Sequence, residues 1–190
     1  MKIQEFANVI SGYTFRETIE NHSNGNVFAI QAKNIISGAN IENGQDLVKI
    51  FFNGARGAFF LQNNDILVVS RGYGINAFRA AVFKNSANNI IASSSIVIIR
   101  ITNDCALPEF ISVFINSKKG QKRIMESVTG SSIKTILRGK FREMNVPTPS
   151  IDKQKIIVAL ADNLKRQKEI NERKIQIERN IIDAIFEKLS

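Results

Sequence analysis

The side chains best suited to bind a ligand are the lysines and arginines of one short window, residues 118–142. Their positive charges suit the binding of anionic groups. This window holds eight basic residues and one acidic residue, Glu126, whereas residues 1–117 hold nine basic and eight acidic residues. Most of the net charge of +9 is therefore concentrated in one segment. Such a concentration favours contacts with the phosphates of a nucleic acid, although a basic run is also typical of a merely solvated face. The eight residues are Lys118, Lys119, Lys122, Arg123, Lys134, Arg138, Lys140 and Arg142.

Catalytic and metal-binding sets are not recognisable in the sequence. The single histidine, His22, lies in a polar stretch and is interpreted as a solvated loop residue. The single cysteine, Cys105, excludes an internal disulfide and a cysteine zinc cluster, and we interpret it as a half-buried apolar residue. The glycines of residues 70–74 lack the spacing of a phosphate-binding loop. We therefore expect a binding protein rather than an enzyme, with no catalytic residues, no metal ion and no cofactor.

Two kinds of element must position the basic side chains. Alternating and β-branched runs predict short strands before residue 105, at residues 26–35, 45–52, 64–72, 76–83 and 93–101. Residues 107–128 predict a helix that starts near Pro108 and breaks or kinks at Gly120. A turn, a short helical piece and a closing strand at residues 142–149 are expected to follow.

The chain changes character at Ser150, because no proline or glycine occurs from there to residue 190. Ser150 is a suitable N-cap and Asp152 suits the first turn of a helix. A helix over residues 150–190 would be about 60 Å long, which exceeds the width of the preceding domain. The sequence thus predicts an α+β fold, with a strand-rich domain at residues 1–149 and one long C-terminal coiled-coil helix at residues 150–190.

Such a helix needs a partner, since it cannot bury its apolar face on its own domain. Spacings of four and three define a seam in which seven of the ten residues are apolar. An antiparallel pair centred on residue 173 places Lys168 opposite Glu178, whereas a parallel pair places like charges together. We therefore predict antiparallel pairing with a second copy; packing on another protein is the alternative. The seam comprises Ile157, Ala161, Leu164, Lys168, Asn171, Ile175, Glu178, Ile182, Ile185 and Leu189.

Several segments, taken in order, resemble a known family. They are SGYT at residues 11–14, NDILVVSRG at 64–72, SSSIVIIRI at 93–101, LPEFISVFINS at 107–117, GSSIKTIL at 130–137 and VPTPSIDKQKIIVALADNLKRQ at 146–167. This series is similar to a target-recognition domain and its spacer helix from the specificity (S) subunit of type I restriction–modification systems. The family usually contains the unit twice, and here it occurs once, so the chain resembles half an S subunit. Lys153 departs from the pattern, because a glutamate commonly precedes the glutamine that is Gln154 here.

The resemblance implies a subunit that carries DNA specificity and has no active site of its own. Its partners would be double-stranded DNA, a DNA adenine methyltransferase subunit that supplies the chemistry, and a restriction subunit. A symmetric helix pair would make the target a split palindrome. No membrane partner is expected, and the absence of a signal peptide or an apolar span makes the cytosol the expected location.

Four residues at predicted turns are our hypothesis for base or groove contacts: Arg56, Arg71, Tyr73 and Arg79. Arginine suits a bidentate contact to guanine, although each could be a solvated or sheet-face residue instead. Two other functions stay open: a recognition domain from a single-chain restriction or methyltransferase enzyme, and a coiled-coil interaction protein without a DNA role.

Overall fold

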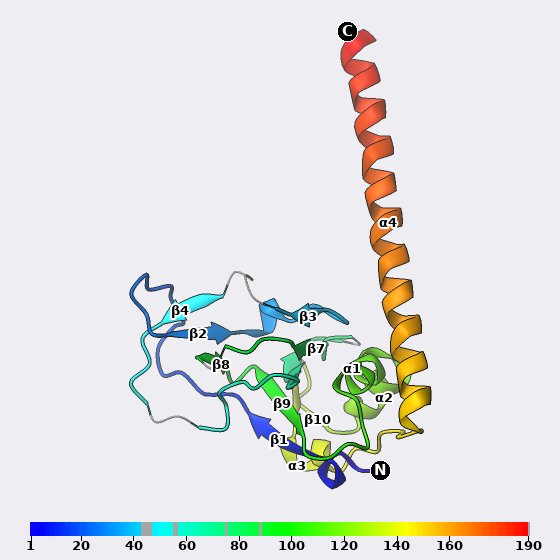
Figure 1. Cartoon of the computed structure of the whole chain (residues 1–190). Helices are drawn as coiled ribbons and strands as arrows, with labels where there is room; N and C mark the ends of the chain where they lie inside the picture. The colour runs from blue at the N-terminus through cyan, green and yellow to red at the C-terminus, as the bar shows by residue number, and fades with distance from the viewer. Residues whose placement is uncertain (43–46, 55–56, 75, 88, 190) are drawn as a thin grey trace.

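The long C-terminal helix dominates the shape of the molecule. The structure, a computed structural model, describes residues 1–42, 47–54, 57–74, 76–87 and 89–189. Helix α4 (Ile151–Leu189) projects well away from the strand-rich part of the chain, as Figure 1 shows. We call the described residues before Ile151 the head. The predicted α+β fold, strand-rich and followed by one long helix, is confirmed.

The head contains a sheet of five strands among the described residues. Their order is β1 (Ala7–Ser11), β9 (Ile96–Ile101), β5 (Ile66–Val69), β7 (Ala80–Phe83) and β3 (Asn40–Ile41). All neighbours are antiparallel except β3 and β7, which are parallel. One smaller sheet has the order β4 (Val48–Ile50), β2 (Val27–Ile30) and β8 (Ile90–Ala92). The other has the order β10 (Val128–Thr129), β11 (Lys134–Ile136) and β6 (Arg71–Gly72). Short 3-10 helices are η1 (Ile3–Glu5) and η2 (Ala32–Asn34).

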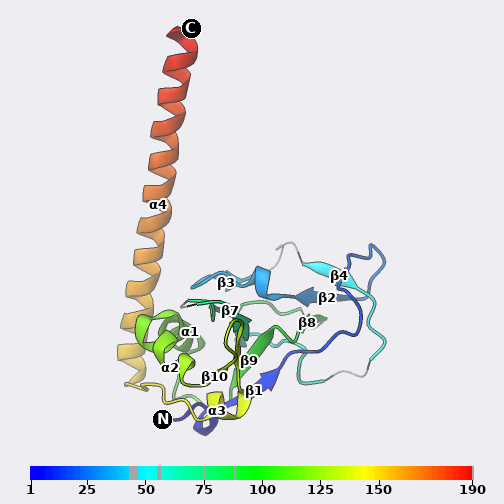
Figure 2. The same ribbon diagram turned by 180° about the vertical axis from the view of Figure 1, so that it is seen from behind.

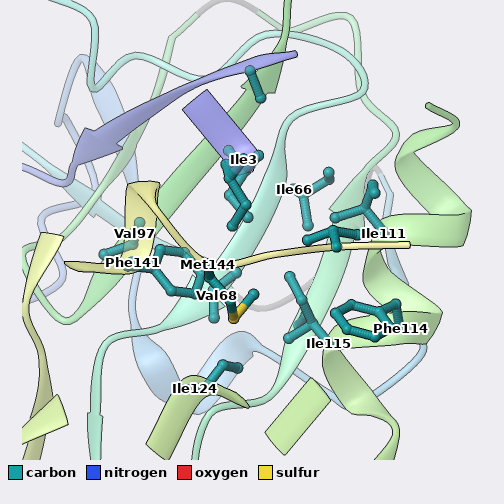
Figure 3. Close-up of a cluster of buried hydrophobic side chains, with 14 of the residues drawn as sticks. Ile3, Ile66, Val68, Val97, Ile111, Phe114, Ile115, Ile124, Phe141 and Met144 are labelled. Atoms are coloured by element: carbon teal, nitrogen blue, oxygen red, sulfur yellow. The ribbon is translucent and has the colours of Figure 1, made fainter. Parts of the chain in front are cut away.

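The central strands are buried on both faces, which explains their nearly continuous apolar sequences. Successive side chains of a strand point to opposite faces of the sheet. In β5, Ile66 and Val68 pack into the cluster beneath helices α1 and α2, whereas Leu67 and Val69 pack into a second cluster with Phe83. Figure 3 shows the first cluster, which the helices and the sheet bury between them. Both faces of the central sheet thus contribute to the core.

Residues 108–125 form two helices, and the break between them lies before Gly120, where the sequence predicts a break or kink. Helix α1 (Pro108–Asn116) begins with its proline, as expected, and α2 (Lys118–Met125) follows directly. The break lies at Ser117, whose side chain accepts a hydrogen bond from the Gly120 N–H at 3.1 Å. The prediction that Gly120 breaks the helix is therefore wrong. A Cβ at Gly120 would lie 2.0 Å from the Phe114 carbonyl oxygen, so the glycine permits close packing of α2 on α1.

The chain between α2 and α4 also differs from expectation. Strands β10 and β11 form a hairpin where a turn is predicted, and α3 (Arg138–Arg142) is the expected short helical piece. The prediction of a closing strand at residues 142–149 is wrong. In place of a strand, the segment has an isolated β-bridge between Asn145 and Lys2. Pro147 and Pro149 lack the N–H groups that a strand ladder requires.

One buried glutamine fixes the start of α4 to the head. Gln154 has no exposed surface, and its Nε2 donates to the carbonyls of Cys105 at 2.9 Å and Pro149 at 2.8 Å. Its Oε1 accepts from the Leu107 N–H at 2.9 Å. The first turns of α4 lie beside α1 in both views, and the remaining length of the helix leaves the head (Figures 1 and 2). Lys153 is exposed, so Gln154 alone of this pair makes the connection.

Candidate nucleic-acid interface

The eight basic residues of the 118–142 window fall on two separate helices and one strand. Helix α2 carries Lys118, Lys119, Lys122 and Arg123, whereas Lys134 lies on β11 and Arg138, Lys140 and Arg142 lie on α3. Among the salt bridges of the described residues, none involves a member of the window. Their charges are therefore available to an external anion.

Helix α2 displays its lysines because its opposite side is anchored in the head. Ile124 is fully buried, and the buried Gln121 donates to the carbonyls of Phe78 at 3.0 Å and Ile115 at 2.7 Å. The three lysines are exposed on the other side. Arg123 differs from them, since it is half-buried and donates to the Asn145 carbonyl. Arg123 therefore connects α2 to the segment that leads into α4, in addition to any contact with a phosphate.

Helix α3 presents its charges in a similar way, around one buried residue. Phe141 is fully buried, and the flanking Arg138, Lys140 and Arg142 are exposed. Arg138 and Arg142 line a shallow groove of about 430 Å³ together with Asn8 and Arg100. Arg100 is held in place by the buried Asp65, with contacts of 2.8 Å from Nε and 2.7 Å from Nη2. The groove therefore has two exposed cationic side chains and one that an ion pair holds in place.

Two of the four proposed base contacts lie beside the basic window. Arg71 is on β6 and Tyr73 follows it, and both side chains are exposed. Strand β6 pairs with β11, which places Thr135 opposite Arg71 and Lys134 opposite Gly72. The structure thus brings residues 70–72 next to residues 134–136, although the two segments are far apart in sequence.

The other two proposed base contacts have different surroundings. Arg79 is half-buried, and its guanidinium donates to the carbonyls of Ile35 at 2.9 Å and Ala32 at 3.2 Å. It also lines a pocket of about 400 Å³ with Lys118 of α2. Arg79 therefore holds the two ends of the short helix η2. Arg56 lies outside the described residues.

The sequence interpretation missed the β10–β11 hairpin and its exposed side chains. Ile133 is 47% exposed and Tyr73 is 68% exposed, and the two residues lie just beyond the ends of the paired strands β11 and β6. Gly130 has a φ of +100°, and a Cβ there would lie 2.2 Å from the Ile133 carbonyl oxygen. This glycine after Thr129 is the sequence signal that could have predicted the hairpin.

Helix α4 exposes most of the predicted seam. The exposed fractions of Leu164, Ile175, Ile182 and Ile185 are 67%, 49%, 52% and 52%. Ile157 is 37% exposed and Ala161 is half-buried, whereas the side chain of Leu189 lies outside the described part of the chain. Lys168 and Glu178 make intrahelical pairs with Glu172 at 3.6 Å and Lys174 at 3.8 Å, and Asn171 is exposed. Such exposed pairs are weak and leave both charges free to face a partner helix.

The described residues contain neither a metal-binding cluster nor a membrane-spanning helix. No cluster of three or more His, Cys, Asp or Glu side chains suitable for a metal ion occurs in the part of the chain that the structure describes. Over the same residues, every helix is too short or too polar to cross a lipid bilayer.

Three solved structures share this fold. The structure reported for complex assembly and conformational transition of a type I R-M system has a TM-score of 0.66 and 13% identity, over 92% of this chain and 40% of that one. The S subunit of a type I restriction–modification system from M. genitalium has a TM-score of 0.56 and 15% identity, over 95% and 42% of the two chains. The HsdS subunit from Thermoanaerobacter tengcongensis has a TM-score of 0.62 and 14% identity, over 92% and 38%. This chain thus spans about two fifths of their length.

Sequence comparison with curated proteins gives no match. The family model of the type I restriction modification DNA specificity domain, however, matches residues 1–179. That match covers the head and most of α4, including the basic window and the Gln154 connection. The chain therefore belongs to the family of type I restriction modification DNA specificity domains.

Proposed function

We propose that this protein is the DNA specificity subunit of a type I methyltransferase complex and that it works as a symmetric pair. The head binds the duplex, and the complex obtains its chemistry from a DNA adenine methyltransferase subunit and its cleavage activity from a restriction subunit. The chain itself contributes recognition and no catalytic residue. Family membership supports the role in DNA specificity. The observation that carries the pairing is the exposed apolar seam of α4, which the head leaves uncovered.

Phosphate contacts by the basic window supply the affinity for DNA. The window carries eight basic residues and a single acidic one, and none of the eight forms a salt bridge among the described residues. Six engaged phosphates would give a log–log slope of affinity against salt of about −5, from about 0.9 per phosphate. Titrating a labelled duplex with the chain at several salt concentrations measures this slope. Binding that is absent, or that does not depend on salt, would contradict the proposal.

A second copy covers the seam of α4 in an antiparallel arrangement centred on residue 173. Ile157 then faces Leu189, Ala161 faces Ile185 and Leu164 faces Ile182. Lys168 faces Glu178 twice by symmetry, and Asn171 faces Ile175. Apolar layers at both ends bury the isoleucines and leucines of the seam, and the opposite charges meet in the polar middle.

This pairing places two heads at opposite ends of the helix pair, related by a two-fold axis. Each head then meets one half-site, so the recognised sequence is a palindrome split by a spacer. Sequencing the methylated bases in cells that hold the chain and its methyltransferase partner reports the motif. A non-palindromic motif, or a chain that sediments as a monomer even with that partner, would refute the symmetric pair.

A further inference from the structure

The outer face of the small sheet β10–β11–β6 carries side chains that do not belong to the core. The register places Arg71 opposite Thr135, and Thr135 opposite Thr129. Residues paired directly across neighbouring strands point to the same face, so these three side chains form one row. The other face carries Gly72, Lys134, Val128 and the buried Ile136, which joins the core.

A second row lies at the end of this face. Tyr73 follows β6 and Ile133 precedes β11, each one residue beyond the end of its strand. Both residues are in bends, and the β6–β11 register, extended by one residue, brings them level with each other. Both side chains are largely exposed, at 68% for Tyr73 and 47% for Ile133. We call these five residues the outer row pair: Arg71, Tyr73, Thr129, Ile133 and Thr135.

The geometry points to the outer row pair as the surface that reads base edges in the major groove of DNA. The inference rests on the proposed DNA-binding function and names the part of the head that carries specificity. A major groove is about 12 Å wide and admits a two-stranded β ribbon. The β10–β11 hairpin is such a ribbon, and β6 pairs along the other edge of β11.

The side chains on this face match the chemistry of base edges. Arginine donates two hydrogen bonds to guanine, and a threonine hydroxyl bonds to any base. The threonine methyl and isoleucine side chains contact the methyl group of thymine. Their exposure is then explained, because a groove-reading surface must stay uncovered until DNA binds.

Charge complementarity selects DNA as the occupant of this face. Helix α3 begins at Arg138, directly after β11 ends at Ile136, and it displays three exposed cations. Phosphates that border a groove would meet these cations when the ribbon enters it. Positioning by phosphate contacts and reading by base contacts are separate tasks in protein–DNA interfaces. Here α3 contacts the phosphates, and the outer row pair contacts the bases.

Selection of bound duplexes from a random pool tests the assignment. The variants are Arg71→Ala, Arg71→Lys and Ile133→Ala, and the controls are Arg16→Ala and Ile36→Ala, two exposed residues outside this sheet. Arg71→Ala is expected to reduce discrimination at one base position of each half-site by roughly 5- to 150-fold, the range for a bidentate contact. Arg71→Lys should retain part of this discrimination. Ile133→Ala should reduce discrimination at a different base position. The controls should keep the wild-type motif.

The outcomes separate this inference from the function on which it rests. If the wild-type chain selects a motif and the Arg71 and Ile133 variants select the same one, the outer row pair does not read bases. Equal loss of affinity for all sequences would also overturn it, because the face would then hold only the phosphate backbone. A wild-type chain that selects no motif would instead overturn the proposed function. Thermal unfolding of each variant shows whether its head is folded. If the Arg71→Ala head is unfolded, the Arg71→Lys variant provides the test instead.

Discussion

Arg100, Arg138 and Arg142 line the same groove, but their side chains are held in different ways. Asp65 is 1% exposed and pairs with both Nε and Nη2 of Arg100, whose Nη2 also donates to the Phe60 carbonyl at 2.9 Å. Arg100→Ala would leave a buried carboxylate without its partner, so we expect a loss of about 3–5 kcal/mol in unfolding free energy. Arg138→Ala removes an exposed side chain and should change stability by less than about 0.5 kcal/mol. Denaturant unfolding of both variants measures the difference; equal effects would contradict it.

Gln154 is the second residue whose role is structural. Gln154→Ala would leave the Leu107 N–H and the Cys105 carbonyl without their partner, at an expected cost of about 1–3 kcal/mol. The adjacent Lys153→Ala is a suitable control, because Lys153 is exposed and its loss should have little effect. Denaturant unfolding again gives the comparison. An unchanged midpoint for Gln154→Ala would show that the start of α4 does not depend on this side chain.

Among the elements, those with long regular patterns could be predicted from the sequence and the short ones could not. The strand at residues 93–101 and the helix from residue 151 follow from their apolar spacing and from the absence of proline and glycine. Strand β10 has two residues, too few for any pattern to indicate, and it forms only by pairing with β11. The small sheet also requires β6, which is distant in sequence. The candidate reading surface therefore depends on a long-range pairing that local patterns do not contain.

We expect helix α2 to contact phosphates through its three exposed lysines. Replacing Lys118, Lys119 and Lys122 together by alanine should lower DNA affinity for all sequences alike, since phosphate contacts carry no base information. If each lysine engages one phosphate, the salt slope should become shallower by about 3. Arg123 is left in place because it also bonds to the Asn145 carbonyl. Lys33→Ala, an exposed lysine outside the window, should keep the wild-type slope. A triple variant with an altered sequence preference would contradict the assignment of α2 to phosphates.

In the proposed helix pair, we expect the charges in the middle of α4 to determine the orientation of the two copies. Lys168→Glu would place like charges together twice in the antiparallel pair, and we expect dimerisation to weaken about tenfold, equivalent to roughly 1.4 kcal/mol. Adding Glu178→Lys restores opposite charges in the same register and should restore the dimer. Arg173→Glu is the matched control, because it also creates a glutamate pair four residues apart on the helix but lies at the heptad position farthest from the seam. Sedimentation equilibrium of the four chains measures the association. A double variant as weak as Lys168→Glu would exclude the antiparallel register, because only that register joins position 168 to position 178 of the second copy.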